Sequence, residues 1–342
     1  MPRLKLALIG CGNIAELVHL PVLALSNRVE LAALVDVDPS RAATYAVRYS
    51  VPGVFEDHRA LPTDIQAAIV ATPPSLHAPI AVDLVRRGLH VLVEKPMALT
   101  AAQCVEMTAA AGEHGVVLAV GMVRRFVASS RLVKALLESN ALGEIRSVDF
   151  REGVGESRPV TPAWRFDRKV AGGGVLMNIG SHVLDLLLWW LGDWTSLRYR
   201  DDAEGGVEAE CEVELAFESG AHAVVELSHT RVLRNSCVVS GTRGVLEVGA
   251  WGRRAEVRLA LSDGALLQGT ASHPSSSDEG VPAVFARQLD DFVEAIQGGR
   301  PPLVTGAEGE RSVSLIEGCY AAREPLQYPW EVPVEPTPHG PG

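Results

Sequence analysis

A glycine pattern near the N-terminus constrains the fold of this 342-residue chain more than any other sequence feature. The run Gly10-Cys11-Gly12-Asn13-Ile14-Ala15 has the form G-x-G-x-x-A, and it joins an apolar run at 4–9 to a helical pattern at 15–25. The first glycine permits a tight turn, the second lets the backbone approach a pyrophosphate, and the small Ala15 lets the helix pack close to the sheet. The N-terminus of that helix presents unpaired N–H groups and the positive end of its dipole to the phosphates. The pattern therefore predicts a dinucleotide-binding turn.

An acidic residue stands where such a turn needs one. Asp36 closes the next apolar run, about 20 residues beyond the turn, where a carboxylate holds the hydroxyls of the adenosine ribose. Its charge disfavours a 2′-phosphate, so we expect NAD rather than NADP, although Arg41 lies near enough in the sequence to leave NADP open. The residues expected to contact the cofactor in this region are Gly10, Gly12, Asn13, Ile14 and Asp36.

Short apolar runs alternate with amphipathic segments as far as Met122. Continuous apolar strands separated by helices are typical of a parallel sheet with both faces covered. We therefore predict an α/β fold that begins with a Rossmann dinucleotide-binding domain over residues 1–122. The expected strands are 4–9, 31–37, 67–71, 90–93 and 116–120, and the expected helices are 15–25, 40–49, 79–87 and 101–114.

The pattern changes in the remainder of the chain. Alternating apolar and polar positions with a glycine turn at 218–220 indicate antiparallel strands with one face towards the core. We predict a substrate-binding and oligomerisation domain over residues 123–342, an α+β unit with a large open, mostly antiparallel sheet. Because such a sheet leaves one face uncovered, we expect a homodimer or homotetramer that pairs through it. Helices are expected at 131–138, 179–191, 285–296 and 308–320, strands at 145–151, 208–217 and 221–228, and a polar loop at 157–169.

Composition disfavours several classes of partner. A formal net charge of -11 and a pI of about 5.4 argue against nucleic-acid binding, because an acidic surface repels phosphate backbones. No apolar stretch approaches the ~20 residues that span a bilayer, and no secretory signal is visible, so we expect a soluble cytoplasmic protein without membrane contact. The cysteines show no metal-ligand spacing, so we expect reduced thiols and no metal. They are Cys11, Cys104, Cys211, Cys237 and Cys319.

Two further segments lie where ligands bind in such folds, beyond the carboxyl ends of strands. Ala71-Thr72-Pro73-Pro74-Ser75-Leu76-His77 follows one strand, and Glu94-Lys95-Pro96 ends the next. Together with the N-terminal turn they resemble the Gfo/Idh/MocA oxidoreductase family, which includes glucose–fructose oxidoreductase and inositol dehydrogenase. The resemblance runs over most of the chain and continues at 121–126, 164–165, 172–182 and 317–323.

This resemblance implies a site shared by the two domains. Lys95 would sit between nicotinamide and substrate, and His182 would reach into the same site from the second domain. The family's substrates are mostly sugars, cyclitols and sugar nucleotides, oxidised or reduced at a secondary hydroxyl. The residues implied on the cofactor side are Thr72, Pro73, His77, Glu94, Lys95, Trp164 and Arg165.

Elementary chemistry supports the same two residues. Hydride transfer from a carbinol carbon needs a group that removes the hydroxyl proton, and histidine is a suitable general base near neutral pH. A buried lysine beside a positively charged nicotinamide has its pKa lowered by desolvation and like charge. Such an amine can hydrogen-bond the reacting oxygen or take part in proton transfer. We therefore predict catalytic roles for Lys95 and His182.

Asn178 departs from one common form of the family pattern, in which an aspartate stands four residues before the histidine. Asparagine can orient a neighbour but carries no charge, so a relay assisted by an aspartate is in doubt. We expect Asn178 in the catalytic and substrate-binding set beside His182. Asp185, one helical turn further on, could orient His182 instead, or serve only in helix packing. Arg125 and Tyr320 are expected to contact substrate, with a structural or a cofactor contact as the alternative for each.

The sequence leaves three functions open. The leading hypothesis is an NAD(P)-dependent oxidoreductase that transfers a hydride between nicotinamide and a secondary hydroxyl or carbonyl of a sugar, cyclitol or sugar nucleotide. The alternatives are a redox-neutral glycoside hydrolase or lyase with tightly held NAD, and a non-catalytic dinucleotide sensor. A sensor needs no proton-handling pair, so the presence of Lys95 with His182 favours an enzyme.

Overall fold

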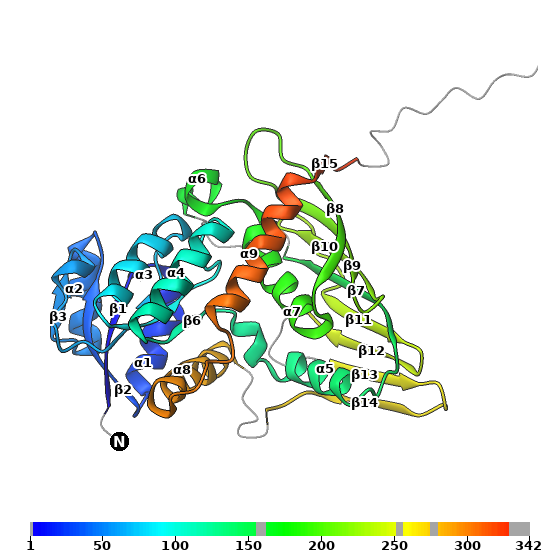
Figure 1. Ribbon diagram of the computed structural model, residues 1–342, viewed down its shortest axis with the longest axis horizontal. Coiled ribbons are helices and arrows are strands. Elements are labelled where there is room, and N and C mark those ends of the chain that lie inside the picture. Colours follow the sequence, from blue (N-terminus) through cyan, green and yellow to red (C-terminus); the bar gives the residue numbers. More distant parts are fainter. Residues whose placement is uncertain (1–2, 155–161, 251–255, 274–279, 328–342) are drawn as a thin grey trace, which may run out of the picture.

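The computed structural model describes residues 3–154, 162–250, 256–273 and 280–327. In these ranges the chain forms two sheets that lie side by side, one in the blue and cyan N-terminal part and one in the green and yellow part (Figure 1). The long helix α9 (Gly306–Ala321) runs between them. This arrangement places the carboxyl ends of the first sheet's strands against the second domain.

The first sheet is parallel and six-stranded, in the order β3-β2-β1-β4-β5-β6. Its strands are β1 (Leu4–Ile9), β2 (Val29–Val35), β3 (Gly53–Phe55), β4 (Ala67–Val70), β5 (His90–Val93) and β6 (Leu118–Val120). Its helices are η1 (Ala15–His19), α1 (Leu20–Leu25), α2 (Pro39–Tyr49), α3 (His77–Arg86) and α4 (Ala101–His114). The strand order reverses between β1 and β4, and a crevice forms at such a reversal. The predicted Rossmann domain is confirmed, and the short edge strand β3 is an element that the sequence did not predict.

Local signals in the sequence explain these elements. Leu6 and Leu8 of β1 are completely buried, as expected for a strand that helices cover on both faces. The Asp38 carboxylate accepts the first N–H groups of α2, and Thr100 forms a capping box with Gln103 at the start of α4. Helices α2 and α4 therefore each begin at a residue whose side chain accepts N–H groups of the first turn.

The second sheet has nine strands in the order β14-β13-β12-β11-β7-β10-β9-β8-β15. They are β7 (Ile145–Gly153), β8 (Trp194–Asp201), β9 (Glu210–Phe217), β10 (His222–Ser228), β11 (Ser236–Gly241), β12 (Gly244–Gly249), β13 (Glu256–Leu261), β14 (Leu266–Thr270) and β15 (Arg323–Pro325). Neighbouring strands are antiparallel except β10 with β7 and β15 with β8. Helices α5 (Ala128–Glu138), α7 (Ser181–Leu191) and α9 lie on one side of the sheet (Figure 1). The predicted open, mostly antiparallel sheet is confirmed.

The other face of this sheet is charged. Along β9 the side chains of Val213 and Leu215 are buried, while Glu212 and Glu214 alternate with them and pair with Arg200 of β8. The expectation that copies of the chain pair through this face remains a prediction, and its chemistry would be that of ion pairs more than of apolar packing.

A late segment of the chain returns to the first domain. Helix α8 (Val281–Gly298) buries Phe285, Leu289 and Phe292 in the hydrophobic core of the parallel sheet. The division predicted from the sequence put these residues in the second domain, whereas their side chains complete the core of the first. An amphipathic helix shows which of its faces is apolar but not which sheet that face covers.

One helical run is apolar and long enough to cross a membrane by length and composition. It extends from Arg168 to Leu191 and includes α6 (Arg168–Ala171), η6 (Leu176–Gly180) and α7. In the folded protein 78% of its most apolar window is buried. The η6 and α7 part of the run lies in the core of the second domain, as expected for a helix that is hydrophobic on all sides.

Truncation of Phe292 tests whether α8 belongs to the first domain's core. Because the ring is 1% exposed, we expect Phe292→Ala to lower the free energy of unfolding by about 3–5 kcal/mol. Urea denaturation measures this loss. The control is Val47→Ala, at a side chain that is 84% exposed on α2, which we expect to change stability by less than about 0.5 kcal/mol. Equal effects of the two substitutions would contradict this role of α8.

Candidate active site

A cavity of about 1470 Å³ lies beyond the carboxyl ends of β1, β4 and β5. The first domain lines it with the glycine turn and with the loops that follow β4 and β5. The second domain closes it with segments around 162–178, 207–209 and 229–230. Most of the predicted site residues meet here. They are Gly10, Gly12, Asn13, Ile14, Asp36, Thr72, Pro73, Glu94, Lys95, Trp164, Arg165 and Asn178.

The glycine turn has the geometry that a dinucleotide requires. Gly10 has φ +91°, and a Cβ there would lie 2.6 Å from the Ala71 carbonyl oxygen, so only glycine fits. A Cβ on Gly12 would meet nothing within 4 Å, which leaves open space beside the backbone. Thr72 contributes a buried hydroxyl that has no hydrogen-bond partner within the described ranges. Open space and an unsatisfied donor on one wall fit a bound dinucleotide.

Asp36 lies under this turn and is almost completely buried. One carboxylate oxygen accepts the Cys11 N–H at 2.8 Å, and the other accepts the Asp38 N–H at 2.9 Å. Arg41 approaches the same carboxylate at 3.5 Å from the solvent side. The carboxylate is thus fixed where a ribose is expected, and Arg41 is near it, as the sequence suggested.

Lys95 connects the two domains. It follows β5, and its Nζ donates to the backbone oxygen of Asn178 at 2.7 Å and to the Asn178 Oδ1 at 3.1 Å. Asn178 lies in η6 of the second domain, and its Nδ2 is 3.3 Å from Nε2 of His229. The ammonium group is therefore held at the boundary of the domains, on the wall of the cavity.

Glu94 binds the backbone of Lys95 and a histidine of the first domain. Its carboxylate binds Nε2 of His19 at 2.9 Å and accepts the Lys95 backbone N–H at 3.2 Å. Burial raises the pKa of Glu94, but the bond and charge of His19 and the charge of Lys95 hold it below its ordinary value overall. His77 is buried between the loops, with Nδ1 2.8 Å from the Pro96 oxygen and Nε2 2.8 Å from the Thr72 oxygen. His77 thus joins the two loops instead of lining the cavity.

His182 stands behind the cavity wall, one turn after Asn178, and does not line the cavity. Burial, followed by the charges of Lys95 and Arg124, lowers the pKa of His182 well below its ordinary value. Its Nδ1 is buried and has no partner in the part of the chain that the structure describes. The imidazole is therefore neutral at physiological pH, which is the form a general base needs.

Trp164 and Arg165 lie on the cavity wall as predicted. They belong to the short helix η5 (Ala163–Phe166), and the Arg165 guanidinium stacks 5.3 Å from the centre of the Trp164 ring. The polar loop expected at 157–169 is therefore partly helical, and residues 155–161 of it lie outside the described ranges.

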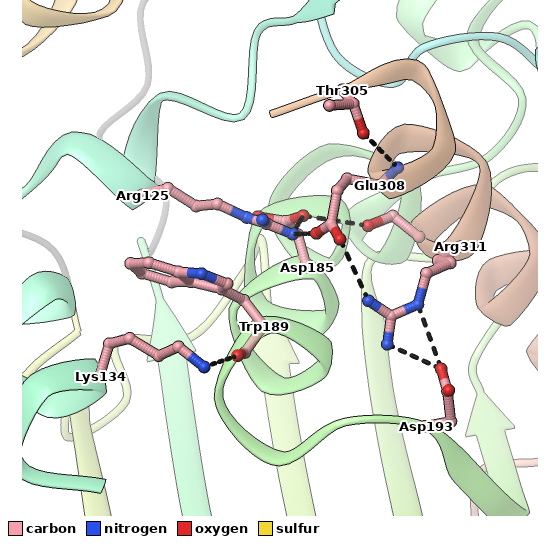
Figure 2. Close-up of polar contacts among 9 residues, drawn as sticks. Arg125, Lys134, Asp185, Trp189, Asp193, Thr305, Glu308 and Arg311 are labelled. Atoms are coloured by element: carbon pink, nitrogen blue, oxygen red, sulfur yellow. Dashed lines mark hydrogen bonds and ion pairs between the residues drawn. The ribbon is translucent and has the colours of Figure 1, made fainter. Parts of the chain in front are cut away.

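The structure corrects the prediction for Arg125. This side chain is 2% exposed, lies away from the cavity, and donates from Nε and Nη2 to the two oxygens of Asp185 at 2.9 and 2.8 Å (Figure 2). Its guanidinium also pairs with Glu308 of α9. A buried guanidinium needs acceptors for its donors, and Arg125 finds them in two carboxylates of the second domain instead of in the cavity. Asp185 likewise binds Arg125 and the Ser312 hydroxyl, so it does not orient His182.

Tyr320 does not line the cavity either. Its hydroxyl donates to Glu208 Oε1 at 2.8 Å. Glu208 is the residue that reaches the cavity, and it also accepts the N–H groups of Gly174 and Leu176 at 2.9 and 3.1 Å. Burial raises the pKa of Glu208 despite these bonds. Sequence reasoning missed both Glu208 and His229, although Glu208 begins one predicted strand and His229 directly follows another.

All five cysteines are buried free thiols, and burial raises the pKa of the Cys11 thiol, which lines the cavity, to about 12. No group of three or more His, Cys, Asp or Glu side chains in the described ranges is placed to hold a metal ion.

Two family models match this chain. The NAD-binding Rossmann-fold domain of the Gfo/Idh/MocA oxidoreductases matches residues 4–122, and the Gfo/Idh/MocA C-terminal domain matches residues 130–247. A crystal structure of aldose-aldose oxidoreductase from Caulobacter crescentus, complexed with glycerol, superposes with a TM-score of 0.83 and 31% identity over 94% of this chain and 97% of that one. This chain belongs to the Gfo/Idh/MocA oxidoreductase family. Its first domain is an NAD-binding Rossmann domain.

Curated relatives in this family carry related names. The D-glucoside 3-dehydrogenase of Escherichia coli K12 is 31% identical over 193 residues, which are 55% of this chain and 54% of that protein. The levoglucosan dehydrogenase of Pseudarthrobacter phenanthrenivorans is 27% identical over 307 residues and 77% of each chain. The alignment thus spans only about half the length of the first of these relatives.

The open space at Gly12 gives a direct test of cofactor binding. We expect Gly12→Ala to fold with unchanged stability but to bind NADH at least about tenfold more weakly, since the added methyl occupies room that the pyrophosphate needs. Fluorescence titration and urea denaturation measure the two properties. Gly112→Ala, in α4 with the same open surroundings, should bind normally and gain up to about 1 kcal/mol of stability. Unchanged NADH affinity in Gly12→Ala would count against this binding mode.

The buried ion pair predicts a purely structural effect at Arg125. We expect Arg125→Met to lower the free energy of unfolding by about 3–5 kcal/mol, because Asp185 is left as an uncompensated buried charge. As the control, Arg198→Met removes an exposed pair with Glu324 and should cost less than about 1 kcal/mol. The double variant Arg125→Met/Asp185→Leu should recover part of the loss. A stable single variant with weakened substrate binding would restore the original prediction.

Proposed function

We propose that this protein is an NAD(P)-dependent oxidoreductase that transfers a hydride between nicotinamide and a secondary hydroxyl or carbonyl of a sugar, cyclitol or sugar nucleotide. One observation carries the proposal. The Lys95 amine, at the end of a strand of the NAD-binding domain, bonds to Asn178 of the second domain on the wall of a cavity that also holds the glycine turn. The Lys95 amine, which can give or take a proton, thus lies between the NAD-binding domain and the second domain, where we expect the substrate.

The residues on the cofactor side have distinct tasks. The turn at Gly12 and the N-terminus of η1 would hold the pyrophosphate, Asp36 the adenosine ribose, and the Thr72 hydroxyl would donate to the cofactor. When bound, NAD(P) supplies the hydride acceptor or donor. NAD remains the expected cofactor, with NADP open because Arg41 borders Asp36.

Lys95 is the group that we assign to the reacting oxygen. Its Nζ is oriented by the two oxygen atoms of Asn178, and it can donate to an alkoxide or, as the free amine, remove a hydroxyl proton. His182 lies behind the wall with a neutral imidazole, so it adds no positive charge beside Lys95. We keep the proposal that His182 is a base. It would accept a proton from Lys95, or from a substrate hydroxyl that extends past the wall of the cavity.

The class of substrate draws support from the relatives. D-glucoside 3-dehydrogenase and levoglucosan dehydrogenase are named for net dehydrogenation of sugars, which favours that reaction over redox-neutral cleavage and over a sensor. A homodimer or homotetramer through the uncovered face of the nine-stranded sheet, and a cytoplasmic location, remain predictions.

Replacement of Lys95 tests the proposal. With NAD or NADP and a panel of free sugars, inositols and nucleotide sugars, we expect nicotinamide reduction with one class of substrate. Lys95→Met should lower kcat by about 10²–10⁴-fold, because the proton-handling group is lost, and leave NADH binding largely intact. Lys5→Met, at the far end of β1, is the control and should turn over normally. Full turnover in Lys95→Met would exclude the proposed role.

A further inference from the structure

His229 lines the cavity, but the proposed reaction gives it no role. It follows the last residue of β10 and lines the cavity, and its Nε2 lies 3.3 Å from Nδ2 of Asn178. Its backbone N–H donates to the Ala209 oxygen at 2.8 Å, which fixes it beside the start of β9. His229, next to the second sheet, thus contacts the side-chain amide of Asn178, which in turn binds Lys95.

The chain on both sides of His229 is held by one buried carboxylate. Glu210 accepts the Ser228 hydroxyl at 2.6 Å and Arg231 Nε at 2.8 Å, and it also accepts the Thr230 hydroxyl. The Ser228 hydroxyl oxygen in turn accepts the backbone N–H groups of Thr230 and Arg231 at 3.1 and 2.6 Å. These bonds hold the backbone on both sides of His229, so the point from which the imidazole extends is fixed by the fold.

The side chain of Asn178 has two unlike ends, and only one suits Lys95. Its Oδ1 accepts from the Lys95 Nζ at 3.1 Å, whereas a half-turn of the amide would point its N–H groups at the ammonium. The two orientations have nearly the same shape, so packing alone does not choose between them. The choice needs a hydrogen-bond acceptor on the other side of the amide, and His229 is placed there.

We propose that His229 is a positioning residue for Lys95: its Nε2 accepts the Asn178 Nδ2 hydrogen and so keeps the Asn178 Oδ1 on the Lys95 amine. The inference rests on the proposed role of Lys95. It requires the neutral tautomer of His229 with the proton on Nδ1, because a protonated Nε2 cannot accept. A chain of three groups then runs from the second sheet to the cofactor side.

The first test needs no substrate and therefore stays informative if the proposed function fails. In the intact chain labelled with ¹⁵N-histidine, long-range ¹H–¹⁵N NMR shows which ring nitrogen carries the proton, and comparison with His229→Gln assigns the signal. We expect the Nδ1–H tautomer in the wild type and a larger share of the Nε2–H tautomer in Asn178→Ala. A wild-type ring protonated on Nε2, or on both nitrogens at neutral pH, would overturn the proposal.

The second test separates positioning from direct contact with substrate. His229→Leu removes the acceptor and should lower kcat by about tenfold with NADH affinity unchanged, whereas His229→Gln places an amide at similar reach and should restore most of the rate. In the Asn178→Ala background, His229→Leu should cost nothing further, because the amide through which it acts is gone. Equal losses with leucine and glutamine, or additive losses in the double variant, would overturn the proposal.

Discussion

A buried guanidinium has to be surrounded by acceptors, and Arg125 imposes this requirement at the point where the two domains join. It stands just after the last strand of the first sheet, and its partners are Asp185 on α7 and Glu308 on α9 (Figure 2). Further bonds extend the network from Glu308 to Arg311 and from Arg311 to Asp193. The short helix η4 (Val123–Phe126), which carries Arg125, is thereby held in one position relative to α7 and α9, since breaking a buried pair leaves an uncompensated charge.

The position of the candidate active site follows from that constraint. Helix α7 continues directly from η6, which carries Asn178, so fixing α7 against η4 also fixes Asn178 against the end of β5. Lys95 can then bond across the boundary to both oxygens of one residue. The cavity between the domains is therefore a product of ionic and hydrogen-bonded contacts that come from distant parts of the chain.

Features of the site that depend on neighbours in the sequence could be predicted. The glycine turn, Asp36 and the Lys95 loop follow strands directly, and strand ends of a parallel sheet gather at one edge. Partners far away in the sequence could not be predicted. Arg125 was assigned to substrate because nothing local shows that its carboxylates lie on α7 and α9. Glu208 and His229 were missed because the order of strands in the antiparallel sheet decides which of their ends reach the cavity.

The fate of the hydrogen on the reacting carbon tests the central claim most directly. A substrate from the panel, deuterated at its secondary carbinol carbon, is incubated with NAD and the products are analysed by NMR. Our account predicts deuterium at C4 of the nicotinamide, on one face of the ring, in an amount equal to the ketone formed. Deuterium that returns to the sugar skeleton with no net cofactor reduction, or that is lost to water, would contradict net hydride transfer at this site.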